Sequence, residues 1–278
     1  MEQQTNPLAQ HFRQAALYIP LPSGGQYWPD GALNLGATGE LGIFPMTAKD
    51  EITLKTPDAL LNGSAVIEVI QSCVPGIIDP WATPSIDIDN ILIAIRIASY
   101  GEMMDVTSTC PHCKEKNDFQ TDLRTLLDQP RHPDFDTPIE ANGMAISLRP
   151  YNYRHINKQN LRNFEEQRAL AIVQNSEMSD EDKLEQFSVS LKKLTKYTVE
   201  AITAAVSKIT LADGTVVDNK AFLDEYFENC DRKVFQKVKD RLDEIAESIK
   251  IPPLEGECTE CHKVYKTELE FDQANFFA

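Results

Sequence analysis

Apolar residues recur every three or four positions through much of the second half of the chain, which predicts amphipathic helices there. The longest pattern starts at Ser179, which has an acid three residues later as in a capping box, and it predicts a helix of about 28 residues. Two further helices are predicted over 219–229 and 231–249, and Asp213-Gly214 predicts a hairpin turn within 209–217. The apolar positions of the long helix are Leu184, Phe187, Leu191, Leu194, Ile202 and Val206.

The first half alternates shorter patterns. A helix is predicted from Thr56 towards Ile70, weakened at Asn62-Gly63, and a second over 87–100 is apolar nearly all round, which places it in the core. Arg96 in that helix then needs a partner or a route to solvent. Short strands are predicted at 41–47, 51–54, 103–109 and 145–150.

These patterns predict an α+β fold that is mainly helical, with short antiparallel strands. Proline-rich stretches suggest a division of the chain into four regions. In the first of them, prolines are expected to prevent regular secondary structure. That first region either lies as an arm on another surface or packs on its own chain. The regions are 1–30, an extended N-terminal arm; 31–129, a mixed α+β region; 130–250, a helical insertion; and 251–278, the C-terminal strand region.

Two short cysteine pairs lie about 140 residues apart, one in the second region and one in the last. Cys110-Pro-His-Cys113 and Cys258-Thr-Glu-Cys261 each lead into a strand-like tail. A Cys-x-x-Cys turn directs two thiolates at one ion, and tetrahedral zinc needs four. The sequence therefore predicts one structural metal site made of Cys110, Cys113, Cys258 and Cys261, in a zinc-ribbon-like element that the helical insertion splits.

Other interpretations of the cysteines remain open. Four thiolates also suit an iron–sulfur cluster, the two pairs could be unrelated reduced thiols, and a Cys-x-x-Cys can have a redox use. His112 and His262 lie within or beside the pairs as substitute ligands, although each pair is complete without them. Cys73 and Cys230 lie in apolar helical contexts and are expected to be buried free thiols.

Charge narrows the range of partners. The chain carries a net charge of −16, and four zinc-bound thiolates would make it about two charges more acidic. Such a surface repels phosphate backbones, so we expect no nucleic-acid partner. No apolar run reaches membrane-spanning length and the first residues lack signal-peptide character, so we expect no membrane contact and folding in a reducing cytoplasm.

Sequence motifs for catalysis are absent. The chain contains no Gly-x-Ser-x-Gly elbow, Walker loop, His-Glu-x-x-His helix or dinucleotide fingerprint, and its five histidines are scattered. Acidic pairs are abundant in the sequence, and we therefore interpret them as solvated helix faces and not as a catalytic acid/base pair. We therefore expect no catalytic residues and no enzyme activity.

Three sequence blocks, together with the ending 271–278, resemble the baseplate hub proteins of T4-type contractile-tailed bacteriophages. The likeness covers the N-terminal third and about the last thirty residues, whereas the helical middle is similar only in kind. The cysteine pairs are not part of the likeness and rest on their spacing alone. The three blocks are Tyr18-Ile-Pro-Leu-Pro-Ser-Gly-Gly25, Phe44-Pro-Met-Thr-Ala-Lys-Asp-Glu51 and Thr56-Pro-Asp-Ala-Leu-Leu-Asn-Gly63.

The resemblance implies a non-enzymatic virion protein of the tail baseplate, made in the host cytoplasm and needed for tail assembly. Its implied partners are other baseplate and tail hub proteins, and the chain is expected to be present in multiple copies in a symmetric assembly. The terminal Phe276 and Phe277 would suit a partner groove or could pack on their own domain. Two alternatives stay open: a zinc-ribbon nucleic-acid-binding protein, and an assembly chaperone that leaves before the tail is finished.

Overall fold

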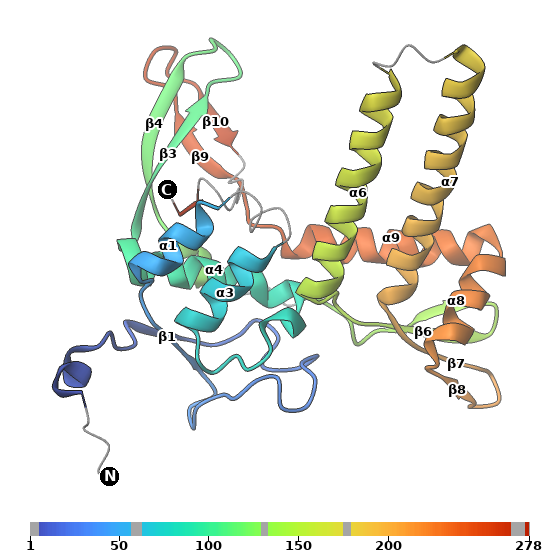
Figure 1. The fold of residues 1–278 in the computed structure, drawn as a ribbon, viewed down its shortest axis with the longest axis horizontal. Coiled ribbons are helices and arrows are strands. Elements are labelled where there is room, and N and C mark those ends of the chain that lie inside the picture. The colour runs from blue at the N-terminus through green and yellow to red at the C-terminus, as the bar shows by residue number, and fades with distance from the viewer. Residues whose placement is uncertain (1–5, 57–62, 129–132, 175–178, 268–275, 278) are drawn as a thin grey trace. The chain divides into compact units, whose positions relative to one another are not determined.

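The computed structural model describes residues 6–56, 63–128, 133–174, 179–267 and 276–277, and it divides into two compact units (Figure 1). The first unit is formed by 1–80, 87–130 and 251–278, and the second by 81–86 and 131–250. In the described residues there are eight α-helices, and every strand pair is antiparallel. The fold is thus mainly helical with short antiparallel strands.

The first unit contains β1 (Leu17–Ile19), β2 (Leu41–Ile43), α1 (Ala48–Leu54), α3 (Ser64–Cys73), α4 (Ser85–Tyr100), β3 (Met103–Thr109), β4 (Lys116–Asp122), α5 (Arg124–Leu127), β9 (Leu254–Glu257) and β10 (Val264–Thr267), the first two residues of α4 being counted with the second unit. The second contains β5 (Ile139–Ala141), β6 (Met144–Leu148), α6 (Tyr153–Gln174), α7 (Asp180–Ala204), β7 (Val206–Thr210), β8 (Val216–Val217), α8 (Lys220–Asn229) and α9 (Arg232–Ile249). Short 3-10 turns lie at Pro7–His11 and Pro80–Ala82.

Near the N-terminus, β1 pairs with β2 in an antiparallel ladder that places Leu17 opposite Ile43. The expectation that prolines exclude regular structure before residue 30 is therefore wrong at β1. Proline removes a backbone donor only where it stands, and the three residues of β1 precede Pro20. The segment pairs with its own chain here.

Helix α1 replaces a predicted strand. Thr47 accepts a hydrogen bond from the backbone of Asp50, and the Asp50 carboxylate accepts one from the backbone of Thr47, which is a complete capping box. This cap starts a helix that runs through 51–54, so the strand predicted there is wrong. The next helix, α3, begins after Gly63 in a left-handed conformation (φ 72°), and residues 57–62 of the predicted helix lie outside the described residues.

The predicted core helix is confirmed in α4, where residues 91–95 are all buried. Arg96 has two partners, because its Nε donates to the Phe276 carbonyl at 3.2 Å and its guanidinium lies 4.5 Å from the Tyr100 ring centroid. Phe276 and Phe277 are buried, with ring centroids 5.1 Å apart. Of the two alternatives for this pair, the structure favours packing on their own chain over a partner groove.

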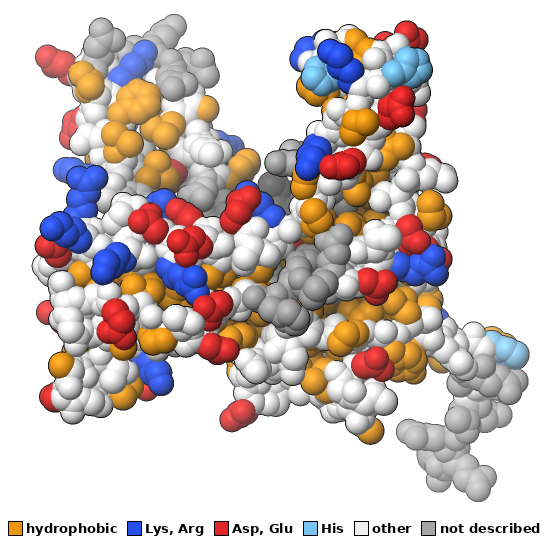
Figure 2. Space-filling view, turned by 180° about the vertical axis from the view of Figure 1, so that it is seen from behind, with side chains coloured by type: hydrophobic (Ala, Val, Ile, Leu, Met, Phe, Trp, Pro, Cys, Tyr) orange, Lys and Arg blue, Asp and Glu red, His pale blue; other side chains and the backbone are white. Residues whose placement is uncertain are grey.

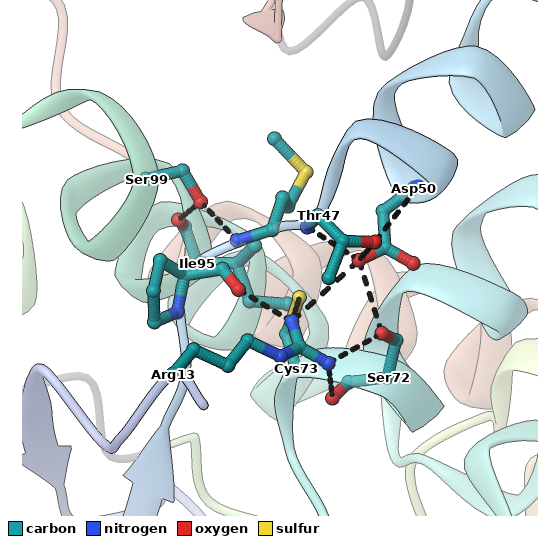
Figure 3. Close-up of polar contacts among 9 residues, drawn as sticks. Arg13, Thr47, Asp50, Ser72, Cys73, Ile95 and Ser99 are labelled. Atoms are coloured by element: carbon teal, nitrogen blue, oxygen red, sulfur yellow. Dashed lines mark hydrogen bonds and ion pairs between the residues drawn. The ribbon is translucent and has the colours of Figure 1, made fainter. Parts of the chain in front are cut away.

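Arg13 ties the N-terminal segment to α1 and α3 (Figure 3). Its guanidinium donates to the backbone and side-chain oxygens of Ser72, each at 2.7 Å, and to the Pro45 carbonyl. Ser72 in turn donates to Asp50 at 3.0 Å. Burial, followed by the Asp50 charge, raises the pKa of Cys73 beside this group to about 11, so Cys73 is a protonated, buried thiol.

Asp87 anchors a second part of the N-terminal segment to the start of α4. The Ser23 backbone N–H and hydroxyl donate to its carboxylate at 2.9 and 2.6 Å, and the Trp28 indole N–H donates at 2.9 Å. Asp87 is fully buried, and burial raises its pKa although all three bonds act to lower it. This carboxylate is the common acceptor for three donors of one loop.

The second unit packs helices on a four-stranded sheet with the order β5-β6-β7-β8. The hairpin predicted at 209–217 is confirmed, with Gly214 at φ 85° in its turn. Ser179 caps α7 by accepting from the backbone of Asp182, and Asn219 and Asp231 cap α8 and α9. Sheet and helices share a core that includes Ile146, Leu148, Ile202, Val206, Ile209, Leu223, Phe227, Val234 and Val238.

None of the helices in the described parts of the chain is both long and apolar enough to cross a bilayer.

Candidate metal centre

Two β-hairpins of the first unit carry the cysteine pairs in their turns. Cys110 to Cys113 connect β3 to β4, and Cys258 to Cys261 connect β9 to β10 (Figure 1). The strand tail predicted after the first pair is confirmed as β4. The tail predicted after the second pair is confirmed as β10 over 264–267, and its remaining residues 268–271 lie outside the described residues. Each pair therefore sits at the tip of a ladder that fixes where the turn begins and ends.

The two turns have the same backbone geometry. In the first, the Cys110 N–H donates to the Glu115 carbonyl at 2.8 Å and the Lys114 N–H donates to the Cys110 carbonyl at 3.0 Å. The second repeats both bonds at 3.0 Å, between Cys258 and Lys263 and between His262 and Cys258. Lys114 and His262, at equivalent positions, both have left-handed backbones, with φ of 67° and 52°. The hairpins are thus two copies of one knuckle.

The two knuckles bring all four sulfurs together. The sulfur atoms lie within 4.8 Å of one another, with Cys110 to Cys261 at 3.7 Å and Cys113 to Cys258 at 3.4 Å. A tetrahedral ion with metal–sulfur bonds of about 2.3 Å separates its ligands by about 3.8 Å. The four cysteines therefore have the spacing that a single ion requires and could bind one.

Backbone dipoles favour ionisation of the first cysteine of each pair. Hydrogen bonds from the backbone of Cys261 and then Glu260 lower the pKa of Cys258 to about 6, against the effect of burial. Burial acts to raise the pKa of Cys110, but bonds from Cys113 and His112, at the equivalent positions, help bring it below its usual value. Around Cys113 the other thiols outweigh the backbone bond from Glu115 and raise its pKa to about 12. A cation bound among the sulfurs would favour the thiolate form of Cys113.

Asn117 joins the knuckles from the side. Its side chain is buried, its Oδ1 accepts from the backbone and hydroxyl of Thr259 at 2.8 and 3.0 Å, and its Nδ2 lies 3.6 Å from the Cys258 sulfur. The same Nδ2 donates to the Glu115 carbonyl at 3.1 Å. One amide thus connects both turns and contacts a sulfur.

A second layer of contacts lies along the strands. The Ser108 and Tyr265 hydroxyls are 2.5 Å apart and buried. The Phe119 ring lies over Gly256, where an added Cβ would be 3.5 Å from it. These contacts join the two hairpins along their strands.

The histidines near the cysteines lie away from the cluster. His112 and His262 are exposed, and His262 Nδ1 is 3.4 Å from a Glu257 oxygen. Among the described residues the group that could hold an ion consists of the four cysteines. Cys73 is buried as expected, whereas Cys230 is half-buried and lies at the C-cap of α8.

Sequence reasoning missed Asn117, Ser108 and Tyr265. Asn117 stands in the polar run that follows Cys113, where nothing in composition marks a buried residue. The available signal was its two-residue spacing from Phe119, which puts both side chains on one face of β4.

Replacing Asn117 with alanine is expected to weaken the binding of a metal ion to the four cysteines by about 10- to 100-fold, because the amide that orients both turns is lost. Competition with a chromogenic chelator measures the affinity. The matched control is Gln120→Ala on the same strand, whose exposed amide bonds Asp105 and not the knuckles. Equal affinities in the two variants would show that Asn117 does not position the ligands.

A protein-family comparison covers nearly the whole chain. The family model described as T4 bacteriophage base plate protein matches residues 21–278. The chain belongs to this family. The baseplate protein therefore has a structural role in a phage baseplate and a location in the virion tail, among other baseplate proteins. Comparisons with curated proteins and with solved structures find no match.

Proposed function

We propose that the chain is a non-enzymatic structural subunit of the hub or wedge region of a contractile tail baseplate and is needed for tail assembly. In this proposal a zinc ion bound by Cys110, Cys113, Cys258 and Cys261 holds together a zinc-ribbon-like element. The observation that supports it is the single cluster of four sulfurs, built by two hairpins of a baseplate-family chain.

The donor set favours a closed, structural site. All four positions of a tetrahedral ion would be filled by protein, which leaves none for water or substrate. In an iron–sulfur cluster the thiolates are distributed over separate irons, whereas these sulfurs surround one point. Among single ions, zinc binds such ligands more tightly than ferrous iron.

The ion would fasten distant parts of the chain. Residues 131–250 of the second unit lie in sequence between the two knuckles. Bound zinc would hold the entrance and exit of that long segment at one place, while Lys114, Lys116, Lys263 and Lys266 offset the charge of the thiolates. The expected result is a fixed shape for assembly.

Metal analysis tests the site. Protein purified without added metal is expected to contain a single zinc ion per chain, with the four cluster thiols protected from a thiol reagent until a chelator is added. Absence of metal together with free titration of all thiols in the native protein would overturn the metal proposal. It would leave the family assignment intact.

A deletion and the composition of purified tails test the biological role. Phage that lack the gene are expected to produce no complete baseplates, and mass spectrometry of purified wild-type tails is expected to find the chain. Tails that assemble normally without the chain would contradict the proposal. Tails that need the gene but do not contain its product would favour the assembly chaperone, and salt-sensitive DNA binding at physiological ionic strength would favour the nucleic-acid-binding protein.

A further inference from the structure

Helix α7 exposes leucines on a side that α6 does not cover. The two helices run side by side as an antiparallel pair within the second unit (Figure 1). Contacts with α6 place Glu200 beside Arg162 and Tyr197 under the Arg162 guanidinium. Leu184 and Leu191, by contrast, are 70% and 61% exposed. Figure 2 shows hydrophobic side chains at the surface of this helix pair, in the upper left of the view.

The exposed leucines belong to a continuous face. Leu184, Ser188, Leu191 and Thr195 follow at spacings of four, three and four residues, which is the pattern of a coiled-coil seam. At 100° per residue the centre of this face lies about 130° around the helix from Ser190, which is buried. We call these four residues the α7 outer face.

The polar members of the α7 outer face are suited to burial. Ser188 and Thr195 are small and exposed, so they leave room for a leucine from a facing helix. The Thr195 hydroxyl donates to the Leu191 carbonyl at 2.9 Å within its own helix. Covering it would therefore leave no unpaired donor.

Charges along one flank of this face are arranged in two halves. Glu181 and Glu185 precede Lys192 and Lys196, all four are exposed, and at 100° per residue they fall within about 60° of one another around the helix. A second α7 placed antiparallel about a two-fold axis near Ser188 brings Glu185 opposite Lys192 and Glu181 opposite Lys196. The symmetry makes each pair occur twice. In a parallel two-fold pair this flank would face the opposite flank of the partner helix, so these four residues would not pair with one another.

We propose that two copies of the chain associate through the α7 outer face, antiparallel about a two-fold axis. A second copy is the occupant that the charges specify, because the acidic half of this flank is complementary to its own basic half. The residues on which this inference rests lie outside the metal centre, so a test of one proposal does not decide the other.

The association is expected to be weak when the chain is alone in solution. Two leucines per copy bury little apolar surface, so the free energy that their burial contributes only slightly exceeds the free-energy cost of association. We therefore expect a Kd of roughly 10 μM to 1 mM. In an assembly that holds copies close together, the high effective concentration would be enough to form the contact.

Charge exchange tests the pairing. Sedimentation equilibrium of the full chain as purified is expected to show a dimer that Glu185→Lys or Lys192→Glu weakens about tenfold, because either change opposes like charges twice. The double variant restores opposite charges and is expected to recover wild-type association. Glu228→Lys and Lys49→Glu, at exposed positions elsewhere, reproduce each change of net charge and are expected to leave the Kd unchanged.

Two results of this experiment would overturn the proposal. One is a chain that shows no dimer at about 1 mM, the upper end of the expected range of Kd. The other is a dimer that tolerates both single reversals or that the double variant fails to restore. A monomer that nevertheless binds another baseplate protein through the α7 outer face would also overturn it, in favour of a different partner.

Cross-linking provides a second measurement that does not depend on charge. Ser188→Cys places a thiol near the proposed axis, whereas Gln186→Cys places one on an exposed position of the same helix about 160° away. A short bifunctional maleimide is expected to join two copies of the Ser188→Cys variant and not of the Gln186→Cys variant. Equal cross-linking of both variants would contradict an interface centred on Ser188.

Discussion

Replacing Cys258 with serine is expected to lower the free energy of unfolding of the zinc-loaded chain by about 5 kcal/mol. The loss follows from the loop that the ion would close, since Cys110 and Cys258 are separated by about 150 residues and a crosslink of that reach removes much of the unfolded chain's entropy. Urea unfolding followed by far-UV circular dichroism measures the change. Cys110→Ser, at the equivalent position of the other knuckle, is expected to have the same effect.

Two serine controls separate the crosslink from ordinary thiol burial. Cys230→Ser, at a half-buried thiol outside the cluster, is expected to cost less than about 1 kcal/mol. Cys73→Ser buries a hydroxyl and is expected to cost about 1 to 3 kcal/mol. A chelator should destabilise the wild type and leave Cys258→Ser unchanged. If Cys258→Ser costs no more than Cys73→Ser, the cluster does not crosslink the chain.

The Asp87→Asn substitution is expected to destabilise the protein by about 3 kcal/mol, although it barely changes the side chain's volume. The two oxygens of Asp87 accept from the Ser23 backbone, the Ser23 hydroxyl and the Trp28 indole. Asparagine has a single acceptor oxygen, so its NH₂ group must face at least one buried donor. Thermal unfolding by differential scanning calorimetry measures the loss.

Asp30→Asn provides the matched control, because Asp30 is exposed and belongs to the same N-terminal segment. It is expected to change stability by no more than about 0.5 kcal/mol. Limited proteolysis adds a local readout, since the loop that contains Ser23 and Trp28 should be cleaved faster in Asp87→Asn. Unchanged stability and cleavage would mean that this carboxylate does not anchor the loop.

Helices with clear local caps were predictable from sequence. The helices predicted over 219–229 and 231–249 were found as α8 and α9, one residue shorter at the start, because Asn219 and Asp231 act as caps. The prediction of a strand over 51–54 was wrong because a local cap starts a helix there as well. Its alternation was too short to distinguish strand from helix, and the Thr47–Asp50 capping box decided for helix.

The cysteine pairs were identified by their spacing, because a Cys-x-x-Cys turn is a local arrangement that the sequence itself encodes. Their supporting residues were not predictable in the same way. Asn117 and Ser108 carry no local mark of burial, and each gains its role from a partner on the other hairpin, namely Thr259 and Tyr265. The same applies to Ser23 and Trp28, whose partner Asp87 is more than fifty residues away.

The sequence by itself determined the helical periods, the caps, the four candidate ligands and the absence of catalytic motifs, since each depends on residues close together in the chain. It also carried the likeness to T4-type baseplate proteins that the family match confirms. The tertiary structure alone decided that the two knuckles meet, that Phe276 and Phe277 pack inward, and that one face of α7 stays uncovered. The physical reason is that burial and pairing between distant segments depend on how the whole chain packs, which no local pattern specifies.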